Sequence, residues 1–168
     1  MNYYDPKVIT YHEKLARELF YKGYNCAQSV FVAFSDLTGY GEEEAARLAS
    51  SFGGGMCGLR TTCGSVTSML MVLGALRGYS APGNHAEKVA HYADGKMLGD
   101  EFSSLFGTII CRELLVGIKT SPVPSERTEE YYKKRPCVRF CAAASNILDN
   151  FLTEKGYDIE KHERSSID

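Results

Sequence analysis

The chain lacks the features of several large protein classes. No uncharged apolar run approaches the roughly 20 residues that span a bilayer, and the first residues lack the basic-then-apolar pattern of a signal peptide. Neither sign of charge dominates, because the formal net charge is -2. Nucleic acid and membranes are therefore not expected as partners, and we expect a cytoplasmic protein.

Several short motifs with known chemistry are also missing. There is no C-x-x-C, which argues against a thioredoxin-like site. The glycine run at 53–55 does not belong to a G-x-x-x-x-G-K-[ST] phosphate loop. The spacing Cys57-x5-Cys63 matches neither a zinc ribbon nor a ferredoxin run. No acid–base or nucleophile–base pair follows from spacing, so the sequence predicts no particular catalytic reaction.

What the sequence does contain is helical periodicity. Its 168 residues, with 44% hydrophobic and 24% charged residues, are typical of one ordinary globular domain. No stretch shows the clear alternation of a strand, whereas apolar residues recur at helical spacing. We predict an all-α domain over residues 1–156, a single compact bundle of about six or seven helices, followed by a polar tail over 157–168.

Turn and cap residues separate the expected helices. We expect helices to begin at Asp5-Pro6, Asn25-Cys26, Gly41, Thr62-Cys63, Asn84, Thr108 and Pro136. The helix from Asn84 to Phe106 contains Gly95 and Gly99, which predict an interruption. The charged segment 117–135 is expected to be a solvated loop with a helical turn near 129–132.

Cysteine is the residue type that indicates chemistry. Disulfides are rare in a reducing cytoplasm, so six cysteines indicate metal binding or redox chemistry, with inert buried thiols as the competing explanation. Four of them map to the first turn of an expected helix: Cys26, Cys63, Cys111 and Cys137. The partial positive charge of a helix start favours a thiolate and would stabilise a negatively charged metal cluster.

Glycines are expected to shape this site. Three of them end the helix before the central one, and a fourth follows Cys63 directly: Gly53, Gly54, Gly55 and Gly64. The backbone freedom of the run is expected to bring Cys57 and Cys63 to a shared centre. Cys137 and Cys141 share one helix face, so both can reach one metal.

The four histidines are weaker candidates as ligands. His12, His85 and His162 lie among polar residues and are expected to be solvated. His91 is expected to face inward, where a lone histidine is more often a hydrogen-bonded core residue than a ligand. The candidate ligands are therefore thiols.

The order of these motifs resembles a known family. The chain contains in turn Asn25-Cys26-Ala27-Gln28, Gly53-Gly54-Gly55-Met56, Cys63-Gly64-Ser65-Val66-Thr67-Ser68, Cys111-Arg112-Glu113-Leu114-Leu115 and Cys137. From Cys26 to about Leu148 this order resembles the family of proposed redox-active proteins named for its C_GCAxxG_C_C pattern. The resemblance implies that the characteristic cysteines are Cys26, Cys63, Cys111 and Cys137, with Cys57 and Cys141 as extras. Ser65 and Ser68 replace an alanine and a glycine of the pattern.

The leading hypothesis is a redox-active protein whose buried cysteine cluster binds an iron–sulfur centre or another thiolate-bound metal, iron or zinc, for electron transfer or redox sensing. The expected ligands are Cys26, Cys63, Cys111 and Cys137, with Cys57 or Cys141 as substitutes. Two alternatives stay open: a metal-free thiol–disulfide protein, and a structural, partner-binding helical domain with inert thiols. The sequence does not identify the redox partner, and a homodimer stays open.

Overall fold

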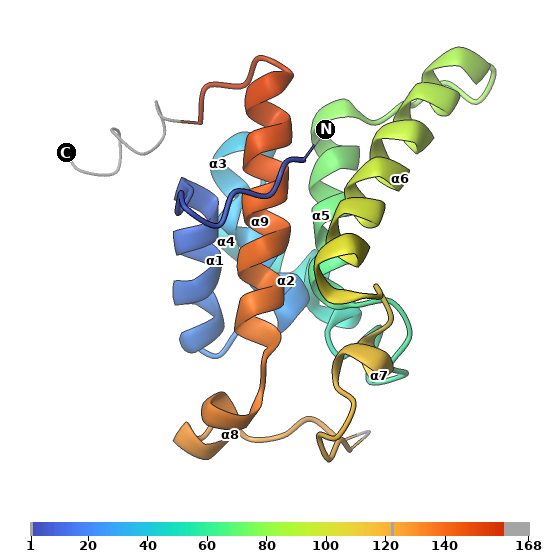
Figure 1. The fold of residues 1–168 in the computed structure, drawn as a ribbon. Coiled ribbons are helices and arrows are strands. Elements are labelled where there is room, and N and C mark those ends of the chain that lie inside the picture. Colours follow the sequence, from blue (N-terminus) through green and yellow to red (C-terminus); the bar gives the residue numbers. More distant parts are fainter. Residues whose placement is uncertain (1, 122, 160–168) are drawn as a thin grey trace.

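Helices make up the regular structure of this chain, in a computed structural model that describes residues 2–121 and 123–159 (Figure 1). The elements are α1 (Tyr11–Tyr21), α2 (Cys26–Ala33), α3 (Ser35–Thr38), α4 (Glu42–Ala49), the 3-10 helix η1 (Ser50–Phe52), α5 (Gly64–Arg77), α6 (His85–Phe106), α7 (Cys111–Leu114), α8 (Glu129–Lys134) and α9 (Cys137–Glu154). The described residues contain no strand, and one isolated β-bridge joins Thr62 to Ile110. The all-α expectation is confirmed.

The described part of the chain contains nine α-helices, more than the six or seven expected. Three of them, α3, α7 and α8, have only four to six residues. α3 is separate because the backbone at Phe34, with φ -96° and ψ 18°, leaves the helical conformation after α2. The other six helices have 8 to 22 residues.

α2 and α9 lie at the centre of the bundle. α2 packs against α1, α4, α5 and α9, and α9 also packs against α1, α5 and α6. Figure 1 shows α9 between α1 on one side and the α5–α6 pair on the other. The spacing of α9 predicts an inward stripe that begins at Cys137, which is half-buried. The rest of the stripe is fully buried: Cys141, Ala144, Leu148 and Phe151. Each large apolar side chain buried in this way contributes about 1.5–3 kcal/mol.

The expected courses of two long helices are wrong. α1 begins at Tyr11, not at Asp5-Pro6, because the side chain of Asn146 holds the backbone of Asp5: its Oδ1 accepts from the Asp5 N–H at 3.0 Å. α6 runs through Gly95 and Gly99 without a break. A glycine in a helix interior costs about 1 kcal/mol relative to alanine, too little to interrupt a long packed helix.

A buried polar network joins α1 to α3 and α9. His12 is fully buried, and its ring nitrogens lie 2.5 Å from Asp149 Oδ1 and 3.0 Å from Asp36 Oδ1. The expectation of a solvated His12 is therefore wrong, since its partners are distant in sequence. His85 is exposed as expected, and His162 lies outside the described residues.

The start of the expected polar tail contacts the bundle. The Tyr157 hydroxyl donates to the Leu76 carbonyl oxygen at 3.3 Å, and Ile159 is buried. Residues 160–168 lie outside the described residues. Among the helices that the structure describes, none has the length and apolar character needed to cross a bilayer.

Candidate functional site

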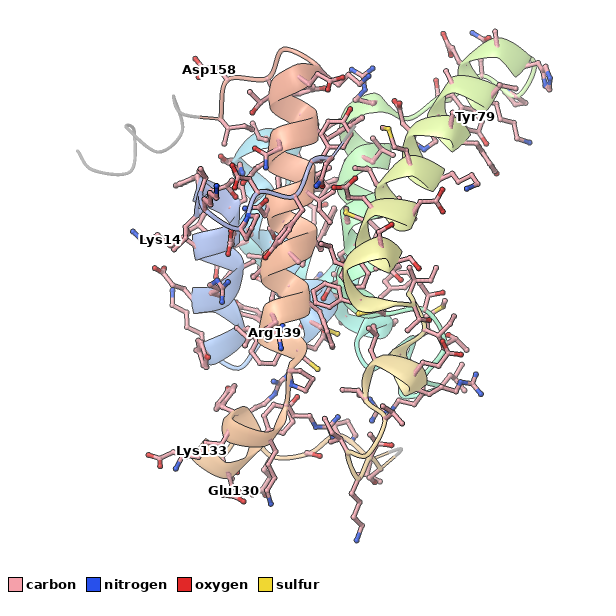
Figure 2. All side chains as sticks on the ribbon, in the orientation of Figure 1. Lys14, Tyr79, Glu130, Lys133, Arg139 and Asp158 are labelled. Carbon is pink, nitrogen blue, oxygen red and sulfur yellow. The ribbon has the colours of Figure 1, made fainter. Side chains whose placement is uncertain are left out.

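Four cysteines line one small cavity where several helices begin. These are Cys26 of α2, Cys63 before α5, Cys111 of α7 and Cys137 of α9. The cavity measures about 60 Å³, which is room for a few atoms, because one water molecule needs roughly 10–15 Å³. In Figure 2, sulfur atoms are visible near the labelled Arg139, at the end of the bundle where α9 begins.

The start of α2 is fixed by a capping box. Asn25 Oδ1 accepts from the N–H groups of Ala27 and Gln28, at 3.0 and 2.9 Å. Gln28 Oε1 accepts in return from the N–H of Asn25 at 3.0 Å. This reciprocal pair satisfies donors that a helix start leaves unpaired. It places Cys26 at the first helical position, as the sequence predicts.

The isolated β-bridge positions two further cysteines. The N–H of Cys63 donates to Ile109 O at 2.8 Å, and the N–H of Cys111 donates to Thr61 O at 2.6 Å. Because of this pairing, Cys63 has the extended conformation of an N-cap (φ -56°, ψ 131°) and lies one residue before the first turn expected for it. Cys111 is the first residue of α7, because Ile110 and not the expected Thr108 is the N-cap. Cys137 is the first residue of α9.

Glycines allow the backbone to approach these thiols. A Cβ atom at Gly64 would lie 2.7 Å from Cys26 Sγ, and a Cβ atom at Gly55 would lie 2.7 Å from Cys111 Cβ. Real Cβ contacts are longer than this, so any larger residue would push the thiols away. Gly64 and Gly55 therefore allow Cys26 and Cys111 to approach the cavity. For the glycine run, the sequence instead predicts this effect on Cys57 and Cys63.

The other two glycines of the run serve the same loop. Gly53 packs against the side chain of Asn25, whose Cγ would lie 2.5 Å from a Cβ atom at position 53. Gly54 lines the cavity, and its backbone N–H contacts the thiol of Cys26. The loop is thus held against the capped start of α2.

The two extra cysteines do not line this cavity. Cys57 is exposed and lines a neighbouring depression. Cys141 is fully buried behind the cavity, where its thiol donates to Cys26 O at 3.6 Å and accepts from the Ser65 hydroxyl at 3.4 Å. Ser65 replaces the alanine of the family pattern, and its hydroxyl therefore contacts Cys141 within the core.

Burial keeps the thiols protonated. Burial, together with the neighbouring Cys26, raises the pKa of Cys137 to about 12. Burial likewise raises the pKa values of three other thiols: Cys26, Cys63 and Cys141. In the absence of a metal, these groups are therefore neutral thiols near neutral pH.

Positive groups around the cavity lower the pKa values of two of these thiols. The backbone N–H of Gly54 and the guanidinium of Arg127 lower the pKa of Cys26, and Arg135 lowers the pKa of Cys137. Arg60 completes a set of three arginines on the cavity wall, whose described residues include no carboxylate. The sequence does not indicate these arginines, because two of them lie in the segment 117–135, expected to be a solvated loop. No motif marks them; their positions depend on how that loop folds back.

The candidate ligand side chains are not arranged as a site for a single metal ion. Within residues 2–121 and 123–159, no three His, Cys, Asp or Glu side chains are arranged to hold one metal ion. A tetrahedral zinc site requires sulfur atoms about 2.3 Å from the metal. The role of the four cysteines as metal ligands stays a prediction.

Comparison with family models matches residues 24–151 to the family described as "Putative redox-active protein (C_GCAxxG_C_C)". The chain belongs to this family. The match confirms the resemblance seen in the sequence and includes every cavity cysteine of this C_GCAxxG_C_C protein. No curated protein and no solved structure matches the chain. A family described as redox-active agrees with a site built from thiols.

Proposed function

We propose that this C_GCAxxG_C_C protein is a redox protein whose cavity cysteines bind an iron–sulfur centre for electron transfer or redox sensing. The observation that carries the proposal is that four thiols from separate segments, and three arginines, line one cavity. An iron–sulfur centre held by four cysteines supplies reversible one-electron chemistry. The proposed ligands are Cys26, Cys63, Cys111 and Cys137.

The protonation of the thiols favours a metal centre over a dithiol site. Thiol–disulfide exchange requires a thiolate, and the best attacking thiol has a pKa near the ambient pH. Burial raises the pKa values of Cys26, Cys63 and Cys137, so the metal-free protein lacks an activated nucleophile among them. A coordinating metal deprotonates a thiol directly and does not need a lowered pKa in advance.

The spacing favours a cluster over a single ion. No three candidate ligands in the described residues have the arrangement that one ion requires. A cluster with several metal atoms holds its thiolates farther apart than one ion does, and so fits a cavity whose cysteines come from separate segments. A single iron or zinc ion would require the helix starts to move closer together.

The chain's own groups would offset the charge of the bound thiolates. Arg127 and Arg135 already interact favourably with the charged forms of Cys26 and Cys137. The starts of α2 and α9 add the partial positive charge of a helix N-terminus. These groups would lower the cost of placing several negative sulfur atoms in one buried site.

Metal analysis of protein purified without oxygen tests the proposal. We expect iron and acid-labile sulfide in the wild type, with a visible absorption band that bleaches on reduction. Cys63→Ser should lose most of the iron, because a hydroxyl is a poor replacement for a soft thiolate. Cys57→Ser is the matched control and should retain the wild-type iron content, because Cys57 lies outside the cavity. Circular dichroism checks that both variants fold.

Other outcomes would replace the proposal. Stoichiometric zinc with no iron would show a structural metal site, because zinc has no redox chemistry. Protein without metal that reversibly loses two free thiols on mild oxidation would support the thiol–disulfide alternative, provided that Cys63→Ser abolishes the loss. If the protein shows no metal and no reversible oxidation, the alternative of a structural domain with inert thiols is supported.

A further inference from the structure

A depression lined by arginines opens beside the cysteine cavity. It measures about 370 Å³ and shares six lining residues with the cavity: Asn25, Gly54, Arg60, Arg127, Tyr131 and Arg135. We call it the arginine vestibule. Because the two spaces share these walls, a molecule in the vestibule lies beside the cysteine cavity.

The charge of the vestibule is not compensated. None of Arg60, Arg127 and Arg135 forms an ion pair within residues 2–121 and 123–159. The described residues that line the vestibule include no aspartate or glutamate. Three neighbouring cations without counter-charges produce a strongly positive local potential, which attracts anions.

Arg127 is held in place with one donor nitrogen unused. Its guanidinium carbon lies 4.5 Å from the ring centre of Tyr131 and 4.9 Å from that of Phe20. Its Nη2 donates to Tyr24 O at 3.0 Å, whereas Nη1 is buried and has no hydrogen-bond partner. An unsatisfied buried donor costs about 1–3 kcal/mol, and more when it is charged. An acceptor that reaches this nitrogen would recover that energy.

The other two arginines are also positioned by contacts. Arg60 Nη2 donates to Ser121 O at 2.9 Å. The guanidinium carbon of Arg135 lies 5.3 Å from the ring centre of Tyr131, so two arginines contact the same ring. All three cations are therefore ordered around one space before any ligand binds.

One wall of the vestibule is an unusual left-handed turn. Positive φ angles run through five successive residues, including the non-glycine residues Met56 (63°) and Cys57 (49°). The turn is closed by a hydrogen bond from Arg60 N to Gly54 O at 3.1 Å. Such conformations cost free energy and are concentrated at functional sites. This turn sets the position of Arg60 relative to the loop that carries Arg127 and Arg135.

We infer that the arginine vestibule binds an oxyanion and presents it to the cysteine cavity. Guanidinium groups bind the oxygen atoms of phosphate, sulfate and carboxylate groups through two parallel hydrogen bonds. The volume of the vestibule admits a free oxyanion or the anionic group of a larger molecule. Its importance for redox chemistry rests on the proposed function, whereas the binding itself does not.

Calorimetric titration of the reduced full-length protein tests the inference, with inorganic phosphate and adenosine monophosphate as probes. We expect saturable binding that Arg127→Gln weakens about tenfold or more, the equivalent of one charge-assisted hydrogen bond. Arg60→Gln should also weaken binding. This second variant is needed because Arg127→Gln also removes the packing of Arg127 against two rings. Arg139→Gln is the matched control, an exposed arginine of α9 outside the vestibule (labelled in Figure 2), and should change affinity less than about twofold.

The two probes distinguish the sources of the oxyanion. Equal affinities would assign the vestibule to a free oxyanion, and tighter binding of adenosine monophosphate would assign it to a phosphate on a larger molecule; both support the inference. No saturable binding to the wild type, or equal weakening by Arg139→Gln, would overturn it. Probe binding is measured without reference to metal content, so a failure of the metal proposal is recognised separately.

Discussion

The sulfur atom of Cys26 lies against the backbone of Gly64, so close that a Cβ atom at position 64 would be 2.7 Å from it. The same Cβ would lie 2.8 Å from Phe52 O. Gly64 follows Cys63 directly and begins α5, whereas Cys26 begins α2. Two helices that carry cavity cysteines therefore meet at a residue without a side chain. This contact sets how closely their thiols approach the cavity.

Gly64→Ala should destabilise the protein, because the added methyl group meets a sulfur atom and a backbone oxygen. We expect a loss of about 1–3 kcal/mol in the free energy of unfolding, measured by urea denaturation. Gly74→Ala in the same helix is the control, since a Cβ there meets nothing within 4 Å. It should be neutral or stabilising by about 0.5–1 kcal/mol. Equal effects of the two substitutions would contradict the close contact.

The six thiols should react with iodoacetamide at very different rates. Cys57 is the exposed cysteine, whereas Cys63, Cys111 and Cys141 are buried. Alkylation requires an accessible thiolate, so the reduced, metal-free protein should gain one label rapidly at position 57. Burial also raises the pKa of Cys137 to about 12, which slows its reaction further. Peptide mass spectrometry over a time course identifies the labelled positions.

Cys57→Ser is the control for this pattern. It should abolish the rapid phase and leave the slow phase unchanged, because the remaining thiols are partly or fully buried. Urea should bring all thiols to one fast rate. Rapid labelling of Cys63 in the native protein would show that the cavity is open to the reagent, contrary to its burial.

Local sequence rules predicted the elements that depend on neighbouring residues. The capped start at Asn25 and the start of α9 after Pro136 both occur where cap preferences place them. All four cavity cysteines lie beside a helix start, but α7 begins after Ile110 and not after the expected Thr108. Cys63 was misplaced by one residue because a long-range bond to Ile109, not a local cap, sets its conformation.

Features that depend on distant partners could not be predicted in this way. His12 looked solvated because its carboxylate partners, Asp36 and Asp149, are far along the chain. Arg127 looked like part of a charged loop because nothing near it in sequence indicates the ring of Phe20. Spacing carries no information about such contacts, so the arginine part of the site required the structure.

Asn146 should be important for the N-terminal segment that crosses α9. The residue is buried, and its amide nitrogen donates to Val8 O at 2.9 Å and to Glu13 Oε2 at 2.8 Å. Asn146→Ala should cost about 1–3 kcal/mol, because buried acceptors lose their donor. Limited proteolysis should then cut before Tyr11 faster than in the wild type. Asn150→Ala removes a bond to Tyr3 O and one to Asn146 Oδ1 but leaves the bonds that Asn146 donates, so it should have the smaller effect. The reverse order would contradict this role.

His12 should make the stability of the protein depend on pH. Burial lowers its pKa, but hydrogen bonds to Asp149 and Asp36 and their charges outweigh burial and raise the pKa from 6.5 to about 9. A raised pKa means that the folded state binds the proton more tightly than the unfolded state. The stabilisation is therefore complete below pH 6.5 and is lost as the pH rises through about 9.

The size of this effect follows from the shift in pKa. It corresponds to about 3 kcal/mol in the free energy of unfolding, measured by urea denaturation at a series of pH values from 6.5 to 9. His12→Gln should be less stable at the lower end of this range and should flatten the decline. His85→Gln, at an exposed position, should leave the decline unchanged. The buried thiols add their own loss of stability only where unfolded cysteines ionise, near the upper end. A decline of equal slope in wild type and His12→Gln would show that another group titrates.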